Sequence, residues 1–434
     1  MLLIYSPKIT NRIRYTCNLL FKDILGIAFE IVTDIDRFKN YSFEKINYSN
    51  AYIGDEIFLQ AKNVLFETGI TNQDIQITDW NGHKIFFQTG RNFSLPFDVF
   101  ACTFYLVSRY EEYLPHIRDK FDRFNASESL SYKHDFLQKP VIDKWAYLLR
   151  DILLVRYPNM KFPKRKYKYL STIDIDNAYA YKEKGPVRMV GAYAKSFAKF
   201  DMGEVIERTK VLLGLQKDPY DTYELQFDVQ KRYGIKPLYF ILLGDYAEHD
   251  RNVPFESPKF RTLIKHLSDY ADVGIHPSFA SGDDKAQLRT ELTRLSSILN
   301  REITKSRQHF LKLRLPDTYR NLIEIDIKND YSMGYASQLG FRAGTCTPFN
   351  FYDLDQEVET PLKVHPFAVM EATLKYYLKV DPEDAMEHVK PIIDSVKAVD
   401  GIFVSLWHNE TLSNDKLWSG WQSLYEDVVK YACN

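Results

Sequence analysis

Cysteine is scarce in this sequence, and the few cysteines stand far apart. The four residues are Cys17, Cys102, Cys346 and Cys433, and they form no C-x-x-C pair. Their spacing excludes a zinc knuckle and a thioredoxin-like redox motif. Single, scattered cysteines are typical of proteins from a reducing compartment, and we expect this chain to come from one.

Long apolar runs and targeting signals are missing as well. No stretch of about 18 apolar residues occurs, which argues against a membrane-spanning helix. The N-terminal sequence MLLIYSPKI lacks the basic segment and the long apolar core of a signal peptide. These absences lead us to expect a soluble, cytoplasmic protein.

The chain also lacks an excess of charge of either sign. Lys and Arg number 57 and Asp and Glu 58, which gives a formal net charge of −1. This balance argues against a strong electrostatic footprint for nucleic acid or an anionic membrane. Hydrophobic residues make up 45% of the chain, enough for a large packed core. The many aromatic residues mainly fill that core, although such rings also serve as stacking platforms in carbohydrate sites.

A basic segment with two prolines, Pro158 to Tyr167, divides the chain into two parts. Residues 1–157 mix strands and helices, and we expect them to form a small α/β domain of unknown role. The strands expected there are Leu2–Tyr5 and Ile27–Val32, and the helices are Arg12–Phe21, Phe97–Leu114 and Ile142–Val155.

In residues 158–434, apolar runs of strand length alternate with segments of helical periodicity. The expected strands are Tyr167–Ile173, Pro237–Leu243, Asp272–His276, Ser306–Phe310, Gly340–Gly344, Leu362–Met370 and Gly401–Trp407. The expected helices include Lys285–Leu299, Pro382–Val399 and Leu417–Ala432. This alternation indicates an α/β fold with a parallel sheet, closed or nearly closed into a barrel. Chemistry in such barrels takes place at the C-terminal ends of the strands.

Two carboxylates, Asp174 and Asp176, stand at the end of the first of these strands. Spaced at i and i+2, both can point into the mouth of a barrel once the strand ends. One can hold a metal ion while the other accepts a proton from water. The alternative is that an aspartate caps the next helix or shapes a turn.

Three histidines stand at the ends of other strands, namely His276, His309 and His408. The chain has only 10 histidines, so three at the strand ends of one sheet would be a rare coincidence if they were placed at random. One aspartate and two histidines with an open position form a usual ligand set for catalytic zinc. His365 also follows an apolar strand and is a reserve candidate. The alternative for each is a structural histidine that only forms hydrogen bonds.

Glycine, aromatic residues and arginine are combined in two neighbouring loops, Asp330–Tyr335 and Gly340–Thr345. Such loops suit the recognition of hydroxyl or carboxylate groups, and the alternative is a β-turn with a surface arginine. We take Tyr331 and Arg342, together with Trp407 beside His408, as candidate substrate-binding residues.

Residues 167–434 resemble the polysaccharide deacetylase (NodB-homology) superfamily. The segment Thr172–Asp176 is similar to the Asp-x-Asp form of its first motif, and His276 matches the first histidine of the second motif, His-Ser-x-x-His. The segment Arg307–Phe310 takes the place of the third motif, Arg-x-Pro-Tyr, and Leu406–His408 matches the last motif. The resemblance implies a distorted (β/α)7 barrel over residues 158–434.

The segments DYSMGY, GFRAGT and SLWHN extend this resemblance to a Bacteroidetes-type group of polysaccharide deacetylases with an extra N-terminal α/β domain. One departure from the superfamily concerns its second motif, where Ala280 replaces the second histidine. We expect His309, from the neighbouring strand, to complete the metal set in its place, and His408 is the alternative.

The resemblance implies a metal-dependent hydrolase that removes acyl groups, such as acetyl, from an N- or O-acetylated carbohydrate. Asp174 is then the base, His408 the acid, and Arg307 faces Asp174. A divalent metal, zinc, is expected on three ligands: Asp176, His276 and His309. Two other hypotheses stay open, a glycosidase-like enzyme that uses Asp174 or Asp176 without a metal, and a sugar-binding barrel without catalysis.

Overall fold

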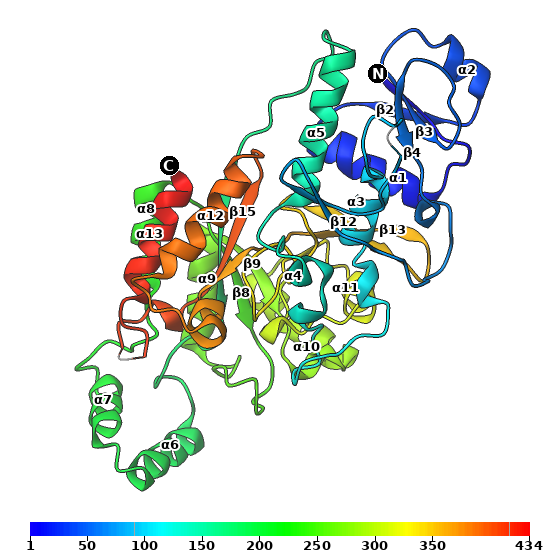
Figure 1. Ribbon diagram of the computed structural model, residues 1–434. Coiled ribbons are helices and arrows are strands. Elements are labelled where there is room, and N and C mark those ends of the chain that lie inside the picture. Colours follow the sequence, from blue (N-terminus) through cyan, green and yellow to red (C-terminus); the bar gives the residue numbers. More distant parts are fainter. Residues whose placement is uncertain (91, 416) are drawn as a thin grey trace.

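Two larger sheets form the framework of the protein in the computed structural model, which describes residues 1–90, 92–415 and 417–434 (Figure 1). The N-terminal sheet has four parallel strands in the order β2-β1-β3-β4. Its strands are β1 (Leu2–Tyr5), β2 (Phe29–Val32), β3 (Lys45–Ser49) and β4 (Ile57–Gln60). The first strand forms as predicted because Leu2, Leu3 and Ile4 are fully buried.

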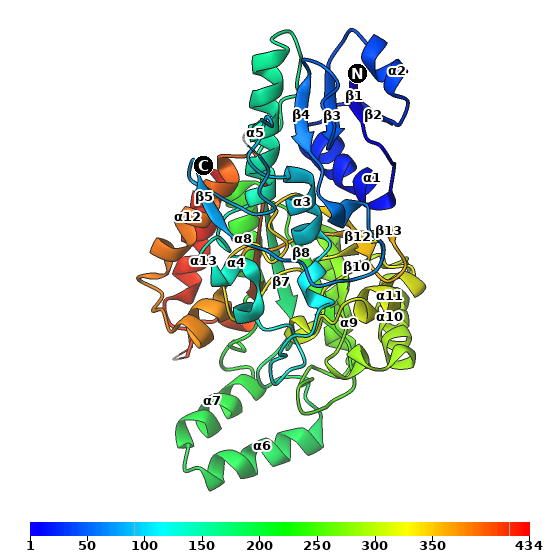
Figure 2. The ribbon, with the colours of Figure 1, turned by 45° about the vertical axis from the view of Figure 1, so that its right-hand side comes forward.

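Of the helices in the N-terminal part, α1 (Asn11–Cys17) and α3 (Val99–Val107) lie between this sheet and the C-terminal part (Figure 2). The elements here are α1 (Asn11–Cys17), α2 (Ile35–Asn40), the hairpin of β5 (Thr78–Trp80) and β6 (His83–Ile85), α3 (Val99–Val107), α4 (Leu130–Lys133) and α5 (Val141–Arg156). Asp98 caps α3, because its carboxylate accepts hydrogen bonds from the backbone N–H groups of Phe100 and Ala101. The helix predicted over Phe97–Leu114 is shorter, since Arg109 adopts a φ of 54° and ends it.

The C-terminal sheet has nine strands in the order β12-β13-β11-β10-β9-β8-β7-β15-β14. All neighbours pair in parallel except β12, which is antiparallel to β13. The strands are β7 (Lys168–Ile175), β8 (Leu238–Leu242), β9 (Asp272–His276), β10 (Lys305–Ser306), β11 (Asn329–Asp330), β12 (Phe349–Asp353), β13 (Val358–Val364), β14 (Val369–Met370) and β15 (Ile402–His408). The expected α/β class is confirmed. In the described residues no pairing joins β12 to β14, so the closed (β/α)7 form stays a prediction.

Helices alternate with these strands, as the sequence pattern indicates. They are α6 (Pro186–Ala198), α7 (Met202–Leu212), α8 (Tyr223–Tyr233), α9 (Pro258–Tyr270), α10 (Lys285–Leu299), α11 (Asp317–Glu324), α12 (Ala385–Lys397) and α13 (Trp421–Cys433). The helix predicted at Lys285–Leu299 has these same bounds because Asp284 caps its start and Asn300, in the left-handed conformation, ends it. None of the described helices is long and apolar enough to span a bilayer.

The prediction of a strand at Gly340–Gly344 is wrong, because this segment forms a tight loop. Gly340 adopts a φ of +123°, and a Cβ atom there would lie 2.4 Å from the backbone oxygen of Leu137. The backbone therefore approaches the N-terminal part too closely for any other residue. The strand predicted over Leu362–Met370 is also interrupted, since β13 ends at Val364 and β14 begins at Val369.

A single cluster of buried apolar side chains runs through both parts of the chain. Tyr15 of α1 packs against Tyr352 of β12, with ring centroids 4.9 Å apart. A buried ion pair crosses the same boundary: Glu112 accepts hydrogen bonds from Arg342 at 2.6 and 2.9 Å. Within the N-terminal part, Glu112 also accepts a hydrogen bond from Arg109 at 2.7 Å. The N-terminal part is thus packed against the edge of the C-terminal sheet and shares its core.

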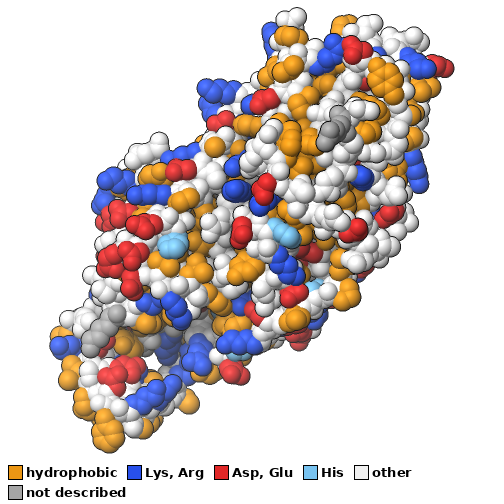
Figure 3. Space-filling view, viewed as in Figure 1, with side chains coloured by type: hydrophobic (Ala, Val, Ile, Leu, Met, Phe, Trp, Pro, Cys, Tyr) orange, Lys and Arg blue, Asp and Glu red, His pale blue; other side chains and the backbone are white. Residues whose placement is uncertain are grey.

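Helices α6 and α7 project from the rest of the molecule as an arm (Figures 1 and 2). In the space-filling view the arm occupies the lower left of the protein (Figure 3). It lies on the side toward which β7 runs (Figure 2), and this is where the strand ends carry the candidate site residues.

Candidate metal centre

Strand ends bring the predicted polar residues together at one edge of the sheet. Asp176 follows β7, His276 ends β9, His309 follows β10 and His408 ends β15. Because β7 pairs with both β8 and β15, and β9 pairs with β8 and β10, these four ends are near neighbours. The parallel arrangement places all of them at the carboxyl edge of the sheet.

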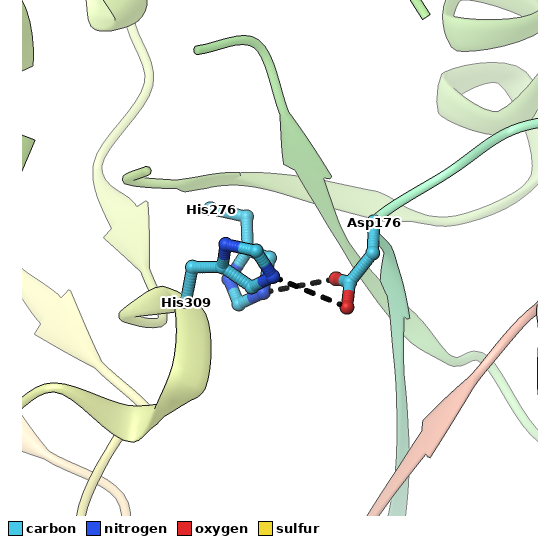
Figure 4. Close-up of side chains that lie close together, drawn as sticks. All are labelled: Asp176, His276 and His309. Carbon is cyan, nitrogen blue, oxygen red and sulfur yellow. Dashed lines mark ion pairs between the residues drawn. The ribbon is translucent and has the colours of Figure 1, made fainter. Parts of the chain in front are cut away.

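Asp176, His276 and His309 form a compact group of possible metal ligands (Figure 4). The Nε2 atom of His276 lies 3.2 Å from Oδ1 of Asp176, and that of His309 lies 3.4 Å from Oδ2. All three ligand atoms lie within 4.8 Å of one another. Two ligands of a tetrahedral zinc ion are about 3.4 Å apart, so the spacing suits a cation between them.

The other ring nitrogen of each of these histidines is already bonded. Nδ1 of His276 donates to the backbone oxygen of Arg307 at 2.5 Å, and Nδ1 of His309 bonds Oδ1 of Asp250 at 2.7 Å. These bonds turn the Nε2 atoms toward Asp176, which is how ligand histidines are oriented at metal sites. Asp176 Oδ1 is buried and has no hydrogen-bond partner among the residues that the structure describes. A buried, unsatisfied carboxylate oxygen facing two imidazole nitrogens fits a cation site.

The charges of these residues shift the pKa values of their neighbours. Burial alone would raise the pKa of Asp176, but the charges of His309 and His408 hold it well below its usual range. Burial would likewise lower the pKa of His309, but Asp176 and Asp250 raise it to about 9. Without a cation, His309 therefore carries a proton at neutral pH and takes over part of the positive charge of the site.

A second pair, Asp174 and Arg307, lies directly behind this group. Nη1 of Arg307 donates to Oδ1 of Asp174 at 3.1 Å and to the hydroxyl of Thr172 at 2.6 Å. Arg307 is fully buried, and its guanidinium lies over the ring of Phe240 at 4.7 Å. The expectation that Arg307 faces Asp174 agrees with this contact, and Oδ2 of Asp174 lies 3.7 Å from Nε2 of His276.

His408 is held by a buried carboxylate, Glu371. Its Nδ1 bonds Oε1 of Glu371 at 2.6 Å, and its Nε2 lies 3.8 Å from Oδ2 of Asp176. Burial would lower the pKa of His408, but Glu371 and Asp176 raise it to about 10. His408 is therefore protonated at neutral pH. Since His309 is nearer to Asp176 than His408 is, the geometry favours His309 as the third ligand.

These residues line a cavity of about 200 Å³. Asp174, Asp176, His276, His309 and His408 all contribute to its wall. Aromatic rings line it as well, contributed by Phe310, Tyr376, Tyr377 and Trp418. The cavity thus combines a polar group of possible ligands with an aromatic wall.

Comparison with known proteins matches the N-terminal part to a family of unknown function (DUF7033), over residues 2–158. No curated protein matches the chain at a significant level. Three solved structures with some similarity are a protein from Mycobacterium smegmatis assigned as a polysaccharide deacetylase, the polysaccharide deacetylase Bc1974 from Bacillus cereus, and wild-type BA3943, a CE4 family pseudoenzyme from Bacillus anthracis.

The similarity to these three structures is low. The M. smegmatis protein is 13% identical, with a TM-score of 0.41 over 63% of this chain and 86% of the other. Bc1974 is 14% identical, with a TM-score of 0.30 over 61% and 88%. BA3943 is 11% identical, with a TM-score of 0.27 over 60% and 62%.

The three predicted substrate-binding residues lie elsewhere. Arg342 is 2% exposed and bonded to Glu112, because it links the two parts of the chain. Tyr331 is buried and stacks on His365, with ring centroids 4.3 Å apart. Trp407 is fully buried and packs on Tyr425, since alternate residues of β15 point to opposite faces of the sheet. The structure brings none of the three to the cavity wall, and no contact supports their predicted role.

Sequence reasoning missed two carboxylates, Asp250 and Glu371. Asp250 lies in the long connection between β8 and α9, and Glu371 directly follows β14. Both are buried and bond the Nδ1 atom of a site histidine. A faint signal exists for Glu371, since an acidic residue just after an apolar strand follows the same rule as Asp176. Nothing in the sequence distinguishes Asp250 from other loop aspartates.

Proposed function

We propose that this chain is a metal-dependent hydrolase of the polysaccharide deacetylase type, built on a distorted (β/α)7 barrel, that removes acyl groups from an acylated carbohydrate. The observation that carries the proposal is the convergence of Asp176, His276 and His309 at the wall of a cavity that also presents Asp174 and His408. Three ligands and an open side toward the cavity are what a catalytic metal requires.

Zinc suits this ligand set because two imidazole nitrogens and one carboxylate oxygen are donors that it prefers. Asp250 and the backbone oxygen of Arg307 would fix the two rings from behind, as partners of ligand histidines do. Bound there, the ion would act as a Lewis acid toward the acyl carbonyl and favour deprotonation of the attacking water.

Asp174 is the proposed base. Oδ1 is engaged by Arg307, which leaves Oδ2, the atom nearer His276, to accept the proton of the attacking water. Arg307 is fully buried, so the carboxylate is held in one orientation. The guanidinium also balances the negative charge of Asp174 beside that of Asp176.

His408 is the proposed acid. It pairs in register with Asp174 across the adjacent strands β15 and β7, so both groups reach the same bound acyl group. Although burial lowers the pKa of His408, the charge and the hydrogen bond of Glu371 raise it and favour the imidazolium form. It can therefore protonate the leaving amine or alkoxide when the tetrahedral intermediate collapses.

The carbohydrate part of the proposal is supported by the motif resemblance and by the aromatic cavity wall. Tyr376 and Tyr377 are 46% and 41% exposed, and Trp418 completes the wall beside them. Exposed aromatic rings beside a polar centre suit the apolar face of a sugar ring. These rings are better placed for substrate contact than Tyr331, Arg342 and Trp407.

The proposal is tested with purified full-length protein stripped of metal by a chelator and reloaded with zinc. Acetate release from N-acetylglucosamine oligomers should appear with zinc and be absent from an Asp176→Ala variant. Binding of the same oligomers without zinc uptake and without acetate release would favour the non-catalytic sugar-binding alternative. Hydrolysis of the glycosidic bond in metal-free protein would favour the glycosidase-like alternative.

A further inference from the structure

The arm formed by α6 and α7 has an inverted distribution of polarity. Its two helices face each other through polar side chains: Tyr193 bonds Thr209 at 2.9 Å, and Ser196 donates to Glu204 at 2.8 Å. Arg208, which also donates to Glu204, is only 6% exposed. A helical hairpin in water normally buries its apolar side chains and exposes its polar ones. Here the polar groups share the contact with only two buried valines, Val205 and Val211.

Most of the other apolar side chains of the arm point outward instead. Val187 and Val190 of α6 are 84% and 67% exposed, and Ile206 of α7 is 53% exposed. The tip between the helices exposes Phe197 at 52%, Phe200 at 89% and Met202 at 51%, with the exposed Asp201 between the last two. Beyond α7, Leu213 and Leu215 are 69% and 74% exposed. Figure 3 shows exposed hydrophobic side chains at the lower left, where the arm lies.

The arm carries more basic than acidic residues. Residues 186–217 contain six Lys or Arg and three Asp or Glu, although the whole chain has a net charge of −1. Helix α6 has no acidic residue, and Lys195 and Lys199 flank the apolar tip. An apolar tip bordered by lysines matches the boundary between the acyl chains and the head groups of an anionic bilayer.

Hydrogen bonds fix the base of the arm, and the arm lies on the same side of the sheet as the candidate metal centre. The Asp218 carboxylate accepts hydrogen bonds from the backbone N–H groups of Ala180, Tyr181 and Lys182, and so clasps the base of the arm. This base directly follows Asp176 in the chain. Since the arm lies on the side of the strand ends (Figure 2), contact through its tip would bring the cavity near the surface that it touches.

We propose that the α6–α7 arm docks on the surface of an anionic lipid bilayer, with Phe197, Phe200 and Met202 inserted among the acyl chains and Lys195 and Lys199 at the phosphates. A convex tip with lysines beside exposed aromatic and aliphatic groups fits a lipid surface better than a protein groove. The docking extends the proposed function to acylated carbohydrate held at a membrane surface, and the lipid contact itself does not depend on that function.

Vesicle sedimentation with the full-length protein tests this proposal. Wild-type protein should sediment with vesicles of mixed phosphatidylglycerol and phosphatidylcholine, and less so at high salt or with phosphatidylcholine alone. The variant Phe197→Ser/Phe200→Ser/Met202→Ser should need at least about ten-fold more lipid for half-maximal binding. Lys195→Glu/Lys199→Glu should lose the preference for the anionic lipid.

Controls separate this contact from other effects. Phe43→Ser/Tyr52→Ser removes side chains that are 68% and 73% exposed in the N-terminal part and should bind vesicles as wild type does. Asp176→Ala should also bind as wild type, which keeps a failure of the hydrolase proposal distinct. Equal binding by the triple variant, or no binding by wild type, would overturn the proposal. A wild-type dimer in light scattering that the triple variant abolishes would also overturn it in favour of contact between copies.

Discussion

Nδ1 of His309 and Oδ1 of Asp250 lie 2.7 Å apart, although 59 residues separate them in the chain. Asp250 uses its carboxylate a second time, accepting hydrogen bonds from the backbone N–H groups of Phe279 and Ala280. It therefore fixes the ring of one possible ligand and the backbone that follows another, His276. Asp250 thus sets the geometry of the candidate metal centre without being one of its possible ligands.

Replacing Asp250 with Asn should weaken zinc binding about ten- to hundred-fold, the usual effect of losing a carboxylate behind a ligand histidine. Competition with a zinc-sensitive dye measures the change. Asp245→Asn is the matched control, because this neighbouring aspartate is 74% exposed and pairs only with Arg294 within the described chain. An Asp250→Asn protein with unchanged zinc affinity would mean that His309 is not a ligand.

Asn substitutions of Asp174 and of Asp176 should differ in their effects on zinc content. Asp174→Asn should lower kcat about 10²- to 10⁴-fold, as expected for a lost base, with zinc content nearly unchanged. Asp176→Asn should lose the metal as well as the activity, because it removes a ligand charge. Zinc analysis of both purified variants decides the matter. If Asp174→Asn loses zinc while Asp176→Asn retains it, the two roles are exchanged.

Glu371 should control the pH dependence of the reaction through His408. Although burial lowers the pKa of His408, the charge and the hydrogen bond of Glu371 raise it, so the protonated acid is present below the raised pKa and is lost as the pH rises through it. Glu371→Gln keeps the shape of the side chain but removes its charge, and the pKa of His408 should fall. The alkaline limb of the kcat profile should then move to lower pH by about one unit or more. A lower kcat with an unmoved profile would indicate a purely structural role.

Glu112 should stabilise the joint between the two parts. Burial raises its pKa, but Arg342 and Arg109 lower it to about 2, so its stabilising effect is complete above about pH 4.5 and is lost as the pH falls toward 2. Glu112→Gln leaves two buried arginines under-paired and should reduce the free energy of unfolding by about 3–5 kcal/mol near neutral pH. Urea denaturation at several pH values measures this.

The difference between Glu112→Gln and wild type should shrink below pH 4.5, because wild type then loses the same charge. Glu324→Gln, in an exposed pair with Lys285, should leave the urea midpoint unchanged. If Glu112→Gln is as stable as wild type at neutral pH, the ion pair between Glu112 and Arg342 does not hold the two parts together.

Sequence patterns predict the bounds of elements with a clear apolar run or clear capping residues. The bounds of β9 match its apolar run, and the bounds of α10 follow from the capping residues Asp284 and Asn300. Strands β10 and β11 have only two residues each, too short for any periodicity. The apolar and glycine pattern of Gly340–Gly344 predicts a strand, but the segment is a loop whose backbone approaches Leu137 closely. This contact is distant in sequence, so local patterns do not predict it.

The site shows the same division between local and long-range information. Asp176, His276 and His309 could be singled out because parallel strands end at one edge, so position along a strand translates into position in space. Asp250 and Glu371 act through contacts across 59 and 37 residues, which pattern alone does not supply. Arg342 also depends on a long-range contact. An arginine in a glycine-rich loop suggests a substrate contact, whereas the structure pairs Arg342 with Glu112 of the N-terminal part.

Because one core runs through both parts of the chain, we expect cleavage of the connection between them to destabilise the protein far less than removal of the N-terminal part. The connection between α5 and β7 is largely exposed, with Lys161 and Lys164 open to a protease. Cleavage there would leave two fragments that stay associated through Tyr15, Tyr352 and the ion pair between Glu112 and Arg342. Synthesis of the C-terminal fragment alone would instead expose the apolar surface that the N-terminal part covers. We therefore expect the region that carries the cavity to fold poorly without the N-terminal part.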